Sequence, residues 1–141
     1  MLKKVSLIFT AIILILITGI TNTKPVFGGF ADNFDCYEIY TSTYSSTENI
    51  IAVTTLKEYL SVAKKKGESC RVRGDASKDS IFSAFNARLI YIEETKEGTS
   101  YYGYSNKIKY QTEIKGGKVN LHVFVAKDYI KVGSPIIFGS F

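Results

Sequence analysis

Residues 107–125 read KIKYQTEIKGGKVNLHVFV, and this stretch decides the fold. Apolar and polar side chains alternate as far as Ile114, and a second alternating run starts at Val119. Such alternation is typical of strands with one buried and one solvated face. The pair Gly116-Gly117 between the two runs is typical of a two-residue β-turn. The stretch therefore predicts a hairpin whose second strand directs four side chains into a core: Val119, Leu121, Val123 and Val125.

Tyrosine, threonine and β-branched residues predict further strands on both sides of this hairpin. The expected strands cover residues 34–44, 69–73, 87–94, 99–105 and 129–132. The chain ends in a segment too apolar to be solvated, so we expect Ile136, Ile137 and Phe138 to dock on the sheet.

Two helices are expected in the first half of the chain. Thr55 and Glu58 form a capping box, and lysines 64–66 followed by Gly67 suit a helix C-terminus. The apolar residues between them recur with helical spacing, which predicts one buried face: Leu56, Tyr59, Leu60 and Ala63. Ser77 is placed to cap a second, shorter helix. Its expected apolar side consists of Ile81, Phe82 and Phe85.

Helices that come early and strands that come late predict the α+β class. The expected architecture is an antiparallel sheet with two helices packed on one face. Residues 32–141 are enough for a single domain with one core. Residues 1–31 are expected to be a signal peptide or an N-terminal membrane anchor.

The first twenty residues have the layout of a secretory signal. Lys3 and Lys4 precede residues 5–20, which carry no charge and are rich in Leu, Ile and Val. We therefore expect an extracytoplasmic domain, either secreted or anchored. Small-residue triplets that end at Gly28 and Ala31 are candidate cleavage sites. The apolar run is shorter than the roughly 20 residues that span a bilayer comfortably, and both cleavage and anchoring stay open.

The charge of the chain does not favour nucleic acid. The formal net charge is +5, but Lys3, Lys4 and Lys24 are three of the 18 basic residues, which leaves 15 basic against 13 acidic residues in the rest. Such a balance is not that of a polyanion-binding protein. Membrane contact is expected only through an uncleaved N-terminal segment.

Cys36 and Cys70 are the only cysteines. In an exported chain such a pair predicts a disulfide, which would stabilise the domain by about 3–4 kcal/mol in the chain-entropy model. The alternative is two buried free thiols.

No catalytic, metal or cofactor site is predicted from the sequence. His122 is the only histidine, and there is no nucleophile-elbow motif, no Cys-x-x-Cys and no acidic calcium loop. We expect His122 at the surface or half-buried on its strand.

The candidate binding residues are tyrosines and arginines. Tyr102 and Tyr104 share one face of a strand, which suits either cross-strand packing or a glycan- or partner-binding surface. Arg71, Arg73 and Arg88 lie on strands flanking the second helix and are expected to add a basic rim.

The second half of the chain carries a family resemblance. The motifs are SIFSAFNAR at residues 80–88, a tyrosine hairpin, VNLHV at 119–123 and VGSPII at 132–137. Over about residues 77–141 they resemble the YwmB-like family, exported proteins of spore-forming Firmicutes with a fold described as TATA-box-binding-protein-like. The resemblance implies an envelope-facing α+β protein of a Gram-positive bacterium, but no activity and no catalytic residue. The fold name is no argument for DNA binding.

The expected function is therefore that of an exported, non-enzymatic cell-envelope protein. It would bind another protein or a wall component, and the resemblance suggests a link to sporulation. The alternative is a small secreted hydrolase or cell-wall-modifying enzyme.

Overall fold

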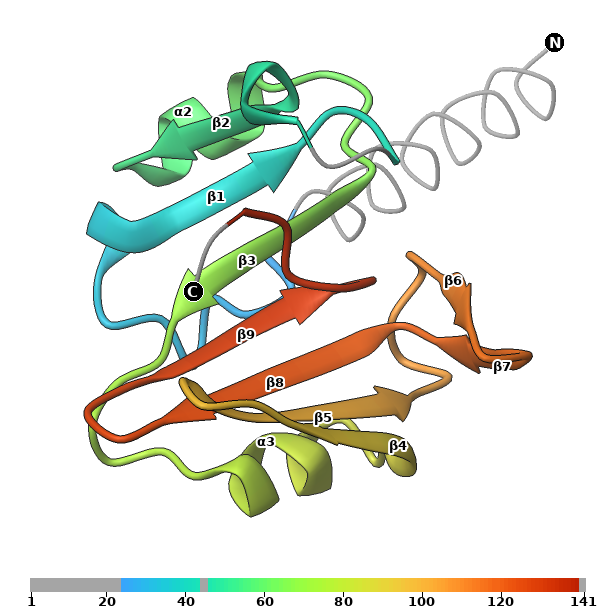
Figure 1. The fold of residues 1–141 in the computed structure, drawn as a ribbon. Coiled ribbons are helices and arrows are strands. Elements are labelled where there is room, and N and C mark those ends of the chain that lie inside the picture. Colours follow the sequence, from blue (N-terminus) through green and yellow to red (C-terminus); the bar gives the residue numbers. More distant parts are fainter. Residues whose placement is uncertain (1–23, 44–45, 140–141) are drawn as a thin grey trace, which may run out of the picture.

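The computed structural model describes residues 24–43 and 46–139, whose strands form two antiparallel sheets (Figure 1). The large sheet has seven strands in the order β2-β1-β3-β9-β8-β5-β4, and the small one pairs β6 with β7. The strands are β1 (Tyr37–Tyr40), β2 (Ile50–Val53), β3 (Gly67–Arg71), β4 (Arg88–Glu94), β5 (Gly98–Tyr104), β6 (Thr112–Ile114), β7 (Gly117–Val119), β8 (Leu121–Ala126) and β9 (Ile130–Ser134). The helices are α2 (Leu56–Ser61) and α3 (Lys78–Ala84), with 3-10 turns η1 (Phe34–Cys36) and η2 (Thr47–Asn49). The predicted α+β class is confirmed.

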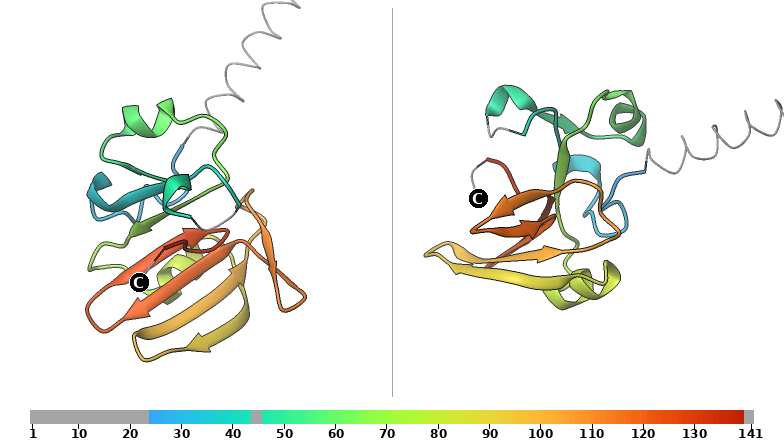
Figure 2. Two further views of the ribbon diagram at one scale, coloured as in Figure 1. Left: turned by 45° about the horizontal axis from the view of Figure 1, so that its top comes forward. Right: turned by 90° about the vertical axis from the view of Figure 1, so that its right-hand side faces the viewer.

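The core lies on one face of the large sheet. Both helices lie on the same side of it (Figure 2) and bury Tyr59 of α2 and Ile81 of α3. The sheet contributes alternate residues of its central strands to the same cluster, including Val123 and Val132. Two helices on one face of an antiparallel sheet is the architecture that the sequence predicts.

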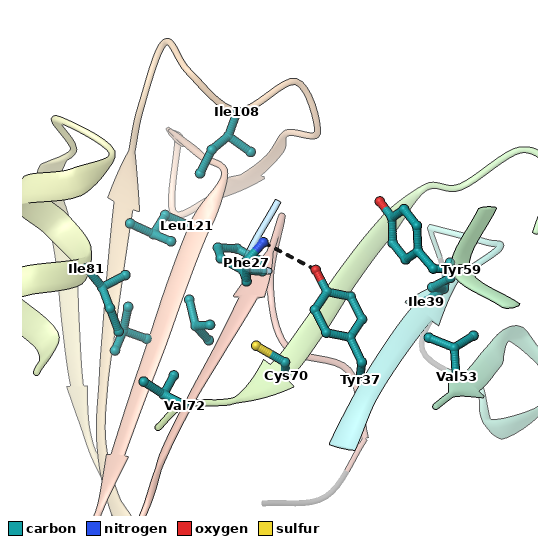
Figure 3. Packing of buried hydrophobic residues seen from close by; sticks show 12 residues of the cluster. Phe27, Tyr37, Ile39, Val53, Tyr59, Cys70, Val72, Ile81, Ile108 and Leu121 are labelled. Atoms are coloured by element: carbon teal, nitrogen blue, oxygen red, sulfur yellow. Dashed lines mark hydrogen bonds between the residues drawn. The ribbon is translucent and has the colours of Figure 1, made fainter. Parts of the chain in front are cut away.

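The segment before η1 belongs to this core. Phe27 is fully buried, and its amide donates a hydrogen bond to the Tyr37 hydroxyl oxygen (3.2 Å; Figure 3). Further along, the Arg73 amide donates to the Phe30 carbonyl (2.9 Å), and Ala31 forms a β-bridge with Val72. The domain boundary expected after residue 31 therefore runs through a packed segment. Both candidate cleavage triplets lie within it.

The stretch from 107 to 125 folds differently from the predicted hairpin. Within this stretch the hairpin is limited to β6 and β7, and its turn is Lys115-Gly116, one residue earlier than expected, with φ values of 49° and 78°. Two positive φ angles are the signature of a type I′ turn. Asn120 ends β7: its buried side chain accepts from the Ser105 amide (2.8 Å) and donates to the Ile108 carbonyl (2.9 Å). These bonds hold residues 105–111, between β5 and β6, as an irregular loop. The predicted second strand of the hairpin is therefore interrupted at Asn120 and forms two strands, β7 and β8.

Only one of the two hydrogen bonds of the predicted capping box of α2 is present. The Thr55 hydroxyl accepts a hydrogen bond from the Glu58 amide (3.1 Å). The Glu58 carboxylate bonds to the Thr54 amide (2.7 Å) rather than to Thr55, so the reciprocal half of the capping box is displaced by one residue.

The predicted C-terminal end of α2 is wrong, and its predicted apolar face is only partly buried. The helix ends at Ser61, and lysines 64–66 lie beyond its last turn. Gly67 does not end the helix but starts β3, where it pairs with Tyr40 of β1. The chain must leave the helix early to reach that pairing. Of the predicted apolar face, Tyr59 is buried, whereas Leu56 and Leu60 are exposed.

Helix α3 agrees with its prediction. The Ser77 hydroxyl accepts from the Ser80 amide (3.1 Å), and the Ser80 hydroxyl accepts from the Ser77 amide (2.9 Å), which is a complete capping box. Ile81 is fully buried against the sheet.

The C-terminal segment docks on the face of the sheet opposite the core. Ile137 and Phe138 are buried, as predicted. The Phe138 amide donates to the Tyr40 hydroxyl oxygen (3.0 Å), and the two rings lie 4.5 Å apart. The sheet is thus covered on both faces around β1, β3, β9 and β8.

Candidate functional site

The structure divides the predicted binding residues between two places. Tyr102 and Tyr104 lie on β5, and Arg88 lies on the neighbouring edge strand β4. Arg71 and Arg73 lie at and beyond the end of β3, which β9 and β8 separate from β5. The arginines of β3 therefore do not rim the tyrosine face.

The tyrosine face is a stack of rings across three strands. Tyr102 stacks on Tyr91 (5.9 Å between centroids) and on His122 (4.3 Å). The Lys115 amine lies 4.1 Å from the centre of the Tyr91 ring and donates to its hydroxyl (2.6 Å). Because neighbours occupy these ring faces, the row presents edges and hydroxyls rather than flat faces. That arrangement suits cross-strand packing better than a stacking platform for sugars.

Tyr104, like Tyr91, has a basic side chain over its ring. The Arg88 guanidinium lies 5.6 Å from its ring centre, and both residues line a small hollow of about 240 Å³ with Asn86 and Asn106. The hollow offers one cation and two amides.

His122 is buried, so the expected surface or half-buried position is wrong. The C-terminal segment covers it, and Nδ1 accepts a hydrogen bond from the Ile137 amide (3.0 Å). Burial lowers the pKa of His122 to about 3, with a smaller contribution from Lys131, so the ring is neutral. A neutral ring that accepts at Nδ1 carries its proton on Nε2, which then donates to the Ser100 hydroxyl oxygen (3.0 Å). A general base acting on Ser100 would need the opposite arrangement.

The cysteines are free thiols in the structure, and the expected bridge is not formed in it. Cys70 points into the core beside Tyr37, its partner across the sheet, whereas Cys36 is exposed at the end of η1. Burial is the main cause that raises the pKa of the Cys70 thiol. Neighbouring elements carry the two residues, but one side chain lies in the core and the other at the surface.

Cys36 lies at the surface, where it lines a cleft of about 630 Å³. The cleft lies between the 32–36 segment, the end of β3 and the β8–β9 turn. Its charged residues are the basic Arg71, Arg73 and Lys127 and the acidic Asp32 and Asp128.

Two contacts orient the arginines of the cleft. The Arg71 guanidinium lies 5.1 Å from the centre of the Tyr129 ring. Arg73 Nε lies 3.4 Å from a carboxylate oxygen of Asp75, and both side chains are at least half exposed. A guanidinium over an aromatic ring keeps its N–H groups at the ring edge available for a carboxylate or phosphate.

The sequence predicts Arg71 and Arg73 but misses the other wall of the cleft. Lys127-Asp128 before Tyr129 marks a turn, and nothing local shows that this turn lies beside β3. Only the pairing of β3 with β9, which sets Arg71 opposite Lys131, brings them together.

The sequence pattern also gives no indication that Glu68 is a buried carboxylate. Glu68 is fully buried on β3 and accepts hydrogen bonds from the hydroxyls of Tyr37 and Tyr59 and from the Val26 amide. Burial raises its pKa, and these hydrogen bonds oppose the rise. The carboxylate joins α2, the sheet and the N-terminal segment, a structural role.

Within residues 24–43 and 46–139, no three His, Cys, Asp or Glu side chains converge where a metal ion would bind. None of the helices in the same ranges is long and apolar enough to cross a bilayer. Compared with known proteins, the chain matches no family model, no curated protein and no solved structure. The resemblance to the YwmB-like family therefore rests on the sequence motifs alone.

Proposed function

We propose that this chain is an exported, non-enzymatic cell-envelope protein that binds an anionic envelope component in the cleft of Arg71 and Arg73. The observation that carries the proposal is the cleft itself. It combines an open volume of about 630 Å³ with three basic side chains, Arg71, Arg73 and Lys127, against two acidic ones, Asp32 and Asp128. The hollow beside Tyr104 is smaller, about 240 Å³.

The chemistry of the cleft favours carboxylate or phosphate groups. The planar guanidinium fork matches both groups with paired hydrogen bonds. Asp32 and Asp128 also line the cleft and would repel an anionic group that is not seated on the arginines. Wall polymers carry phosphates and carboxylates, so the cleft suits a wall component better than a neutral sugar.

The location is supported by the basic and apolar pattern of residues 1–20, which is that of a secretory signal. The resemblance of residues 77–141 to exported proteins of spore formers points to the same compartment and to a link with sporulation. Protease added to intact protoplasts should then degrade the domain, and full protection would contradict export.

The alternative of a secreted hydrolase gains no support from the polar pairs described. The Ser100–His122 pair is buried, and the ring carries its proton on the nitrogen that faces the serine. The exposed Cys36 lies among arginines, and the sole histidine lies on the other side of the sheet.

Sedimentation with purified cell walls tests the proposal. We expect Arg71→Ala/Arg73→Ala to bind walls on the order of tenfold more weakly, because charge-assisted hydrogen bonds are lost. Arg88→Ala, a matched control on β4, should bind like the wild type. Equal binding of the double variant, or release of soluble wall fragments by the wild type, would contradict the proposal.

A further inference from the structure

Helix α2 carries an apolar surface that nothing in the described fold covers. Leu56 and Leu60 are four residues apart and are 49% and 48% exposed. Ile51 on β2, which contacts α2, is 38% exposed. These are three of the five large apolar side chains that are exposed in the described ranges, and the other two lie on β4, at the far edge of the sheet.

The chain that carries this apolar surface is rich in lysine. Residues 56–66 contain four lysines and one glutamate. Lys65 has a structural role, because its amine donates to the Val62 carbonyl (2.7 Å) and lies over the Tyr59 ring. Lys57, Lys64 and Lys66 are exposed, and the last two lie beyond the helix, so the helix dipole does not account for them.

The same surface lies where the N-terminal segment joins the domain. The Tyr59 hydroxyl oxygen of α2, which donates its proton to Glu68, lies 3.4 Å from the carbonyl oxygen of Lys24, the first described residue. Figure 2 shows this end of the described chain beside α2. Only residues 21–23 separate Lys24 from the apolar run 5–20, and three residues span at most about 10 Å. If that run lies in or on a membrane, α2 is therefore held at the membrane surface.

We propose that the β2–α2 surface, defined by Ile51, Leu56, Leu60, Lys57, Lys64 and Lys66, docks on an anionic lipid bilayer. The leucines enter the boundary between head groups and acyl chains, and the lysines extend to the lipid phosphates. The proposal rests on the export part of the proposed function and is independent of the cleft. Glu68, which binds α2, and Arg71, which lines the cleft, lie near opposite ends of β3. Docking through α2 thus leaves the cleft accessible away from the membrane.

Tryptophan fluorescence tests the docking, because the chain contains no tryptophan. Leu60→Trp places a probe on α2, and Leu89→Trp places one of equal exposure on β4. The full-length chain is reconstituted in phosphatidylglycerol vesicles that contain lipids brominated in their acyl chains. We expect strong quenching of the Leu60→Trp probe and little quenching of the Leu89→Trp probe. Equal quenching at both sites would overturn the proposal, because the domain would then have no preferred face on the membrane.

The role of the lysines has its own control. In the Leu60→Trp background, Lys64→Gln/Lys66→Gln should reduce the quenching, as should purely zwitterionic vesicles. Lys96→Gln/Lys118→Gln, which removes the same charge elsewhere, should leave it unchanged. An equal effect of the two pairs would overturn the assignment of these lysines to the membrane contact. Neither result depends on Arg71 or Arg73, so loss of wall binding and loss of docking are separable.

Discussion

Glu68 joins three parts of the chain that are distant in sequence. Its carboxylate receives hydrogen bonds from β1, from α2 and from the segment before η1 through Tyr37, Tyr59 and Val26. The net free energy gained from each of these hydrogen bonds is small. Removing the acceptor would cost more, because the donors would then be buried without a partner. One residue on β3 thereby sets the position of α2 and of the point where the N-terminal segment enters.

Two substitutions of Glu68 should show how much stability depends on an acceptor for these buried donors. We expect Glu68→Ala to lower the free energy of unfolding by about 2–4 kcal/mol, because two tyrosine hydroxyls and an amide lose their acceptor. Glu68→Gln keeps one acceptor oxygen and should cost less. Urea denaturation of the two variants measures the difference, and a milder effect of alanine than of glutamine would contradict the account.

The pKa of Glu68 also predicts a pH dependence. Its folded pKa is raised above the ordinary 4.5, so the folded state holds this proton more tightly than the unfolded chain does. The contribution to stability is therefore full below about pH 4.5 and is lost as the pH rises through the folded pKa. The stability difference between wild type and Glu68→Gln should change across that range. A difference that is constant from pH 4 to 8 would contradict the raised pKa.

His122 predicts the opposite dependence. Its pKa falls from 6.5 to about 3 on folding, so its contribution is present above pH 6.5 and is lost as the pH falls towards 3. As the only histidine, it is easily followed by NMR. Its ring signals should not titrate between pH 8 and 5 in the folded protein. A midpoint near 6.5 would mean that the C-terminal segment does not cover the ring.

The positions of helix α2 and of the segment 24–31 depend on tertiary contacts rather than on their own sequence patterns. The helical spacing of Leu56, Tyr59 and Leu60 correctly predicts a helix, but only Tyr59 finds a core partner because the helix ends at Ser61. The segment 24–31 has no periodic pattern at all and still contributes Phe27 to the core. Its position depends on Tyr37, Glu68 and Val72, which local sequence cannot bring together.

This packing predicts where processing is tolerated. We expect the mature exported protein to retain residues 24–31, because cleavage after Gly28 or Ala31 would remove Phe27 from the core. Intact-mass measurement of the exported protein gives its first residue directly. A mature chain beginning at Gly29 or Asp32 would contradict the packed segment.

The cost of losing that packing can be measured on its own. Phe27→Ala should destabilise the domain by about 3–5 kcal/mol, as buried Phe-to-Ala changes do. Leu89→Ala, at an exposed position, should change stability by no more than about 0.5 kcal/mol. Similar effects of the two variants in urea denaturation would place Phe27 outside the core.

For the whole molecule, composition and periodicity predict the class, the helix at Ser77 and the docking of Ile137 and Phe138. They do not predict the strand order, because β3 pairs with β9 across residues 72–129, which contribute three of the seven strands of the large sheet. That single pairing separates Arg71 from Tyr102 and completes the cleft with the turn at Tyr129. Residue type thus predicts the arginines, whereas the residues around them follow from the strand order.

The central claim is that an anionic envelope component binds at Arg71 and Arg73 and not at the tyrosine row. NMR signals of the arginine Nε–Hε groups measure this most directly during titration of the full-length protein with solubilised wall polymer. The account predicts shifts at Arg71 and Arg73, with Arg88 unchanged. Shifts confined to Arg88 and the rings of Tyr102 and Tyr104 would contradict it and place the binding surface on β4 and β5.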